Sequence, residues 1–177
     1  LRTLSERPDL ADCIWHVSLV WWDVESQRTE VSIPKGILDW AKSMLQFRPT
    51  LRWARKVVRD AKFPTRFETK WICRLFDGDA YAYATLLVSQ LHSLRSLRLD
   101  FSFVLEGGFP GEMLHHALFG NVPPGTLSQF SKLEMADYGS NFPLKQFRDG
   151  VNLGKTYQFI PWFHLPSLKT LEIWLYK

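Results

Sequence analysis

Histidines and cysteines are the residues best suited to chemistry in this chain, but their spacing gives them no shared site. No pair of them forms a C-x-x-C or H-E-x-x-H motif, and no histidine is spaced with Cys, Asp or Glu as a metal-ligand set. A nucleophile elbow, a Walker-type phosphate loop and a dinucleotide fingerprint are also missing from the sequence. We therefore expect no catalysis, no metal site and no cofactor.

Positive charge offers a second kind of chemistry. Ten Lys and Arg residues fall between positions 42 and 74, opposed only by Asp60 and Glu68. Aromatic residues are interleaved with them, namely Trp53, Phe63, Phe67 and Trp71. The segment has two interpretations: a surface that follows phosphates and stacks bases, or solvated faces of amphipathic helices whose aromatics belong to the core. On one predicted helix face the candidate patch for nucleic acid or an acidic partner is Arg52, Arg55, Lys56 and Arg59.

A recurring spacing of apolar residues predicts the elements that position these side chains. Apolar residues at relative positions 0, 3, 6 and 8 begin at Leu91, Leu127 and Leu165, and a weaker copy begins at Ala11. Each copy predicts a short apolar turn that leads into an L-x-L strand, as in leucine-rich repeats. We expect an α/β solenoid with parallel strands at 17–21, 97–101, 133–136 and 170–174. The residues expected in the core are Leu97, Leu99, Leu133, Met135, Leu171 and Ile173.

The segment from about residue 33 to 90 is predicted to be helical throughout. Pro49 is expected to end one helix, and Thr65 with Glu68 suggests a capping box for a later one. Gly78 is the predicted stop of that helix, and Asp79 the predicted cap of the next. We interpret residues 1–177 as a single irregular leucine-rich-repeat domain fragment with a helical, basic insertion at about 33–90.

Side chains between the buried anchors of an L-x-L strand are expected to point outward. They mix aromatic and charged residues, a composition more typical of an interface than of a plain solvated sheet. We hypothesise that they form one strip that binds a partner protein. Its members are Trp22, Arg98, Asp100, Glu134, Tyr138, Glu172 and Trp174.

Composition and the chain ends set the expected context. The chain is 46% hydrophobic and 23% charged, with no apolar run that could span a bilayer and no basic-then-apolar leader. Cys13 and Cys73 are isolated in apolar sequence, so we expect reduced core thiols in an intracellular protein, cytoplasmic or nuclear. The chain starts within an apolar periodic segment and ends after a strand-like run, which we interpret as a fragment.

Two segments of the chain resemble fungal F-box and leucine-rich-repeat proteins. The opening residues 1–11, L-R-T-L-S-E-R-P-D-L-A, are similar to the entry to the repeat region of such proteins. The segments 91–99 and 165–173 are similar to their L-P-x-L-x-x-L-x-L repeats. The resemblance implies substrate recruitment, with an F-box that would lie before Leu1 and bind the Skp1 adaptor of a cullin ubiquitin ligase. The irregular 33–90 segment departs from a uniform repeat array.

The sequence thus favours a protein-recognition module, the substrate-recruiting repeat region of an F-box-type ubiquitin ligase subunit. The alternative is a nucleic-acid-binding module that uses the basic helical segment 42–74. Neither the target nor the oligomeric state follows from the sequence, and no membrane partner is expected.

Overall fold

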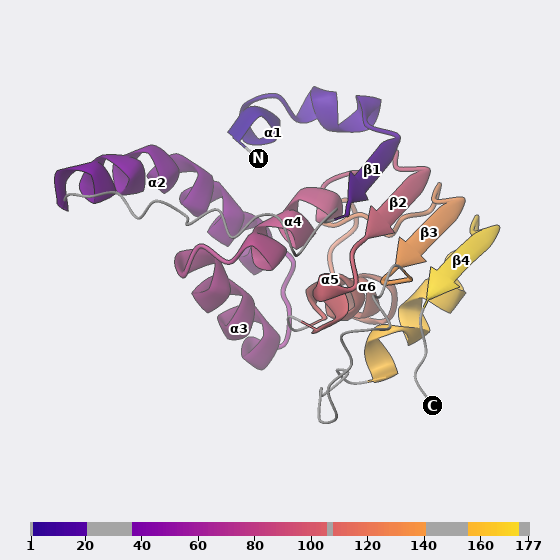
Figure 1. Ribbon diagram of the computed structural model, residues 1–177. Coiled ribbons are helices and arrows are strands. Elements are labelled where there is room, and N and C mark those ends of the chain that lie inside the picture. The colour runs from indigo at the N-terminus through magenta and orange to yellow at the C-terminus, as the bar shows by residue number, and fades with distance from the viewer. Residues whose placement is uncertain (1, 21–36, 106–107, 141–155, 174–177) are drawn as a thin grey trace, which may run out of the picture.

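Four short strands form one parallel sheet. The computed structural model describes residues 2–20, 37–105, 108–140 and 156–173, and within 37–48 it describes only the course of the backbone. The strands β1 (His16–Leu19), β2 (Ser96–Leu99), β3 (Met135–Tyr138) and β4 (Thr170–Ile173) pair in the order in which they follow along the chain. All three pairings are parallel (Figure 1). The prediction of an α/β fold with these strands in one parallel sheet is confirmed.

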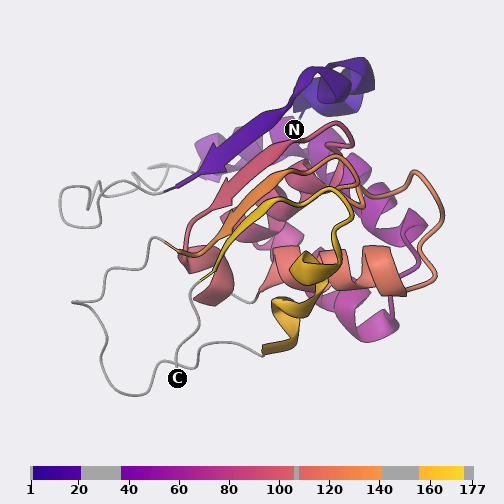
Figure 2. The same ribbon diagram turned by 90° about the vertical axis from the view of Figure 1, so that its right-hand side faces the viewer.

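The described helices lie on one side of this sheet and at its ends (Figure 2). The elements are α1 (Arg2–Glu6), η1 (Pro8–Cys13), α2 (Ile37–Asp60), α3 (Thr65–Phe76), α4 (Ala80–Ser89), α5 (Ser102–Leu105), α6 (Phe109–Phe119), η3 (Thr156–Gln158) and η4 (Ile160–His164). All of them except α1 and η1, which precede β1, lie in the long connections between successive strands that parallel neighbours require. The described part of the predicted helical segment 33–90 consists mainly of α2, α3 and α4.

Two helix boundaries in this segment are confirmed, and two local expectations are wrong. Gly78 has a left-handed backbone (φ +76°) after α3, and Asp79 caps α4 by accepting hydrogen bonds from the N–H groups of Tyr81 (2.8 Å) and Ala82 (3.0 Å). Thr65 is the first residue inside α3, so the expected capping box does not form. Pro49 lies within α2 and does not end it, because proline removes a single backbone donor and the flanking turns keep their own hydrogen bonds.

An aromatic cluster joins the helices behind the sheet. The rings of Phe63 and Phe67 lie 5.0 Å apart, and Phe109 of α6 lies 6.1 Å from the ring of Trp71 in α3. The indole N–H of Trp71 donates to the carbonyl oxygen of Ala82 at 3.1 Å, which ties α3 to α4. All of these side chains are buried. The helical layer is therefore built around the aromatics of the basic segment.

The inward face of the sheet is partly as predicted. Leu97, Leu99 and Leu133 are buried, whereas Leu171 and Ile173 on the edge strand β4 are half-buried. Met135 was expected in the core and is only half-buried, so this expectation is wrong. The pairing of Leu97 with Ala136 and of Leu99 with Tyr138 explains the difference. In β3 the inward residues are Ala136 and Tyr138. Together with Phe130 and Leu133, which are also buried, they follow the spacing 0, 3, 6 and 8 from a start at Phe130.

Two further observations concern the environment of the chain. In the part of the chain that the structure describes, no helix combines the length and apolar character needed to cross a membrane. Cys13 and Cys73 are unpaired thiols, but both are exposed, so their expected place in the core is wrong.

Candidate functional site

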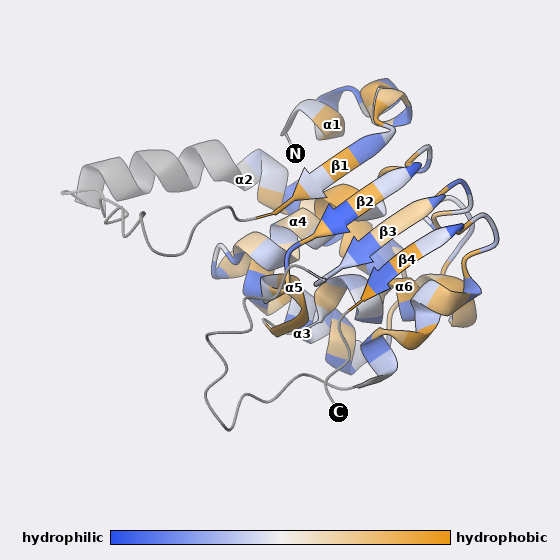
Figure 3. Cartoon of the chain, turned by 45° about the vertical axis from the view of Figure 1, so that its right-hand side comes forward, coloured by the Kyte–Doolittle hydropathy of each residue, from blue (hydrophilic) through white to orange (hydrophobic). Residues whose placement is uncertain are grey.

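One face of the parallel sheet carries a regular array of polar side chains, which we call the open face. Successive side chains of a strand point to opposite sides of a sheet, and hydrophilic and hydrophobic residues alternate along the strands (Figure 3). No helix of the described ranges covers the open face (Figure 2). The strand register places its eight residues in two rows across β1 to β4: His16, Ser96, Met135 and Thr170, then Ser18, Arg98, Asp137 and Glu172.

The centre of the open face is an ion pair between neighbouring strands. Arg98 Nε lies 3.3 Å from Asp137 Oδ2, with 49% of the Arg98 side chain exposed and only 2% of Asp137. The second oxygen of Asp137, Oδ1, accepts the backbone N–H of Ser140 at 3.1 Å. A buried carboxylate needs such donors to offset its desolvation. Asp137 thereby holds Arg98 in a fixed position and leaves part of the Arg98 side chain exposed.

A third row of residues lies where the strands begin, and we call it the amino-end row: Trp15, Arg95, Glu134 and Lys169. The N–H groups of Arg95 and Ser96 both donate to the carbonyl oxygen of Trp15, at 2.8 and 3.0 Å. The same pair of hydrogen bonds recurs at the next two strands. The N–H groups of Glu134 and Met135 donate to the carbonyl oxygen of Arg95, and those of Lys169 and Thr170 donate to the carbonyl oxygen of Glu134. The repeated backbone geometry brings four side chains, distant in sequence, into one line.

The side chains of the amino-end row interact in pairs. The guanidinium carbon of Arg95 lies 5.6 Å from the ring centroid of Trp15, a cation–π arrangement in which Trp15 stays 53% exposed. Lys169 Nζ lies 2.6 Å from Glu134 Oε2, and this hydrogen bond lowers the pKa of the Glu134 carboxyl. An exposed tryptophan held by an arginine is a combination that protein interfaces favour.

The structure brings some of the predicted strip residues together and not others. Arg98 and Glu172 share a row of the open face, and Glu134 lies in the amino-end row. Asp100 lies beyond the end of β2, where its carboxylate accepts the N–H of Ser102 at 2.8 Å and caps α5. Trp22 and Trp174 lie outside the described residues.

Tyr138 was predicted to face a partner, and this prediction is wrong. Its side chain is fully buried, and its hydroxyl donates to Gln158 Oε1 at 2.8 Å. Its ring lies 5.0 Å from that of Trp162. Burial raises the pKa of the Tyr138 hydroxyl, which stays neutral. Tyr138 is thus a core residue because β3 is shifted by one residue from the expected alternation.

Sequence reasoning missed Trp15, Arg95, Asp137 and Lys169. Asp137 directly precedes Tyr138, which was named. The other three share a position: Trp15, Arg95 and Lys169 each come immediately before a strand of the structure. Only the register shows that they form one line with Glu134.

The basic patch is on the helical layer. Arg52, Lys56 and Arg59 are exposed, and Arg55 is half-buried with its guanidinium carbon 5.2 Å from the ring centroid of Phe76. The interleaved aromatics are mostly core residues, since Phe63, Phe67 and Trp71 are buried and Trp53 is half-buried. The interpretation of these rings as a base-stacking platform is therefore wrong for the three buried ones.

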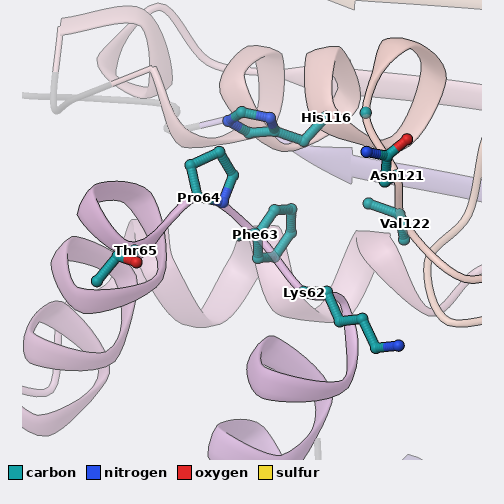
Figure 4. Close-up of a pocket in the computed structure, with 8 residues that line it drawn as sticks. Lys62, Phe63, Pro64, Thr65, His116, Asn121 and Val122 are labelled. Atoms are coloured by element: carbon teal, nitrogen blue, oxygen red, sulfur yellow. The ribbon is translucent and has the colours of Figure 1, made fainter.

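A cavity of about 330 Å³ lies between the turn after α2 and the end of α6 (Figure 4). Its lining includes Lys62, Thr65, His116 and Asn121 around an apolar wall. Burial, followed by the nearby His115, lowers the pKa of His116, whose ring packs 5.2 Å from Phe67. No carboxylate or thiol lines it in the described part of the chain. Lys62 and His116 are the titratable side chains among the described residues that line it.

Within the residues that the structure describes, no group of three His, Cys, Asp or Glu side chains could hold a metal ion. Comparisons of this chain with protein-family models, with curated proteins and with solved structures found no match. The assignment of a function therefore depends on the geometry of the two rows and of the amino-end row.

Proposed function

We propose that this chain is a protein-recognition module that binds its partner on the open face and the amino-end row. One observation carries the proposal: helices cover only one side of a fully parallel sheet in the described part of the chain. Parallel sheets occur almost always with both faces covered. A partner protein that covers the second face would supply the missing layer.

The chemistry of the surface supports a protein partner. Arg98 and Lys169 are held by Asp137 and Glu134, while Glu172 is exposed at the other end of its row. Rows that mix both charge signs suit a partner with complementary charges better than a uniformly charged polymer. Trp15 in the amino-end row offers a large exposed apolar contact at the start of β1, and exposed tryptophans are frequent energetic centres of interfaces.

The specific form of this proposal is substrate recruitment in an F-box-type ubiquitin ligase. It is supported by the resemblance of residues 1–11, 91–99 and 165–173 to fungal F-box and leucine-rich-repeat proteins. The equivalent backbone bonds at the starts of β2, β3 and β4 agree with repeated units. In this form, the Skp1 adaptor would bind an F-box in the intact protein, and the open face would bind the target.

Affinity purification of the intact protein tests the proposal. The wild type should recover the Skp1 adaptor together with target proteins. The double variant Trp15→Ala/Arg98→Glu should still recover the adaptor and lose the targets, because it removes the exposed indole and reverses the central charge of the open face. Phe163→Ala is the matched control, since it removes an exposed aromatic from η4 on the helical layer.

Two results would contradict the proposal, each in a different part. Unchanged recovery of targets by the double variant, with a native circular dichroism spectrum, would show that the open face is not the binding surface. Recovery of targets without the adaptor would leave the recognition surface in place and exclude the F-box form.

A further inference from the structure

A second surface, separate from the open face, lies on the last turns of α2. Arg52, Arg55, Lys56 and Arg59 are three or four residues apart, so they lie on one side of the helix, and we call them the basic strip. The opposite side is anchored in the core by Ala54 and Val58, which are fully buried. In Figure 1 the first turns of α2 form the end of the molecule away from β4, and its last turns lie nearer the middle of the picture, above α3.

The basic strip has no charge partner within the described part of the molecule. Arg7, Lys70, Arg74, Arg98 and Lys169 each lie within 4.0 Å of a carboxylate, but none of the four strip residues does. Like charges at this spacing on a helix repel one another. The strip therefore destabilises α2 slightly unless an outside anion lies against it.

One member of the strip is fixed in place. The guanidinium of Arg55 lies over the ring of Phe76 at the end of α3, and its Nε is buried without a hydrogen-bond partner. Stacking on an aromatic ring holds an arginine while leaving its charge uncompensated. A partner carboxylate beside Arg55 would thus meet a positive group that is already ordered.

The described contacts favour an acidic polypeptide over a nucleic acid. Single-stranded nucleic acid binds by stacking its bases on exposed rings. Phe63, Phe67 and Trp71 are in the core, and the guanidinium of Arg55 lies over the ring of Phe76. The positive charge is also local: residues 42–74 sum to +8 and the whole chain to +4, so the rest of the chain sums to −4.

We propose that the basic strip docks an acidic segment of a partner protein. Side chains three and four residues apart on a helix are about 5–6 Å from one another. A partner helix with carboxylates at the same spacing would place one opposite each cation. This surface is independent of the open face, so the module would engage its surroundings at two places.

Fluorescence anisotropy with a defined probe tests this proposal. The probe is a labelled synthetic helical peptide with Glu at positions i, i+3, i+4 and i+7, and its Gln counterpart measures binding that does not depend on charge. The folded chain should bind the Glu peptide and not the Gln peptide. The variant Arg52→Glu/Arg59→Glu should weaken binding by about tenfold or more, because it reverses two exposed charges of the strip.

A single strip variant, Arg59→Glu, is compared with a matched control. The control is Lys132→Glu, which makes the same charge reversal at an exposed position before β3, outside the basic strip, the open face and the amino-end row. It should change the affinity by no more than about twofold, since screening weakens distant charges. Equal loss in both variants would overturn the proposal, as would failure of the Glu peptide to bind at low salt. Tighter binding of oligodeoxythymidylate or duplex DNA than of the Glu peptide would also overturn it and favour nucleic acid.

Discussion

At the scale of single residues, a buried hydrogen bond holds the last residue of β3. The hydroxyl of Tyr138 donates to Gln158 Oε1, and both side chains are buried. Gly108 and Gly111 pack so closely against Gln158 that a Cβ at either position would overlap it. The hydrogen bond between Tyr138 and Gln158 therefore joins the sheet, α6 and η3. Loss of this bond would leave a buried polar atom unpaired, which lowers the free energy of unfolding.

We predict that Tyr138→Phe lowers the free energy of unfolding by about 1–2 kcal/mol, because it leaves Gln158 Oε1 buried without its donor. Chemical denaturation measures the change. Tyr83→Phe is the control: Tyr83 is half-buried and its hydroxyl has no hydrogen-bond partner among the described residues, so the loss should stay below about 0.5 kcal/mol. Tyr138→Phe/Gln158→Met should regain part of the lost stability, and no difference between the two tyrosines would contradict this account.

At the scale of elements, the end of β3 depends on a glycine turn that packs against α5. Gly139 has φ +80°, and a Cβ on it would lie 2.8 Å from Val104 Cγ2 and 3.1 Å from Phe101 Cδ2. Its N–H donates to the carbonyl oxygen of Leu99 at 2.9 Å, so it also continues the pairing with β2. Backbone conformation and packing both require glycine here.

Gly139→Ala should destabilise the fold more than Gly125→Ala, and the comparison separates packing from backbone strain. Gly125 has nearly the same φ, +78°, but nothing lies within 4 Å of its Cβ position. Each substitution incurs about 1–2 kcal/mol of left-handed strain. Overlap with Val104 and Phe101 should add about 1–3 kcal/mol at Gly139. Equal losses in thermal or chemical denaturation would show that the turn does not pack as described.

At the scale of the whole molecule, the helical layer makes stability depend on pH through His116. The His116 ring, on α6, lies 5.5 Å from the ring of Phe63, in the segment after α2, and 5.2 Å from that of Phe67 in α3. Burial first, and His115 second, lower its pKa from the ordinary 6.5. The unfolded chain therefore takes up a proton on this residue at a higher pH than the folded chain does.

Acidification should thus reduce stability, beginning as the pH falls below about 6.5 and ending below the lowered pKa of folded His116. Denaturation curves at a series of pH values measure this slope, and an NMR titration of His116 locates its pKa. His116→Asn should reduce the pH dependence in this window, since it removes the titrating group. A slope unchanged by the substitution would assign the effect to other groups.

The sequence by itself determined the layers of this protein and most of its helices. The apolar spacing that begins at Leu91 and Leu165 was enough to place β2 and β4, because L-x-L alternation specifies which side of a strand is buried. Gly78 and Asp79 marked a helix end and a helix start through local backbone chemistry. Such features depend on neighbours in sequence, which is why they could be inferred without the fold.

Only the tertiary structure decided the register of β3 and, with it, the composition of the candidate site. The spacing 0, 3, 6 and 8 fits two overlapping frames there, one ending at Met135 and one at Tyr138. Packing of Tyr138 against Phe159 and Trp162 selects the second frame, and a shift of one residue turns every side chain to the other face. The amino-end row of Trp15, Arg95, Glu134 and Lys169 likewise exists only once the strands are aligned, because its members come from four distant segments.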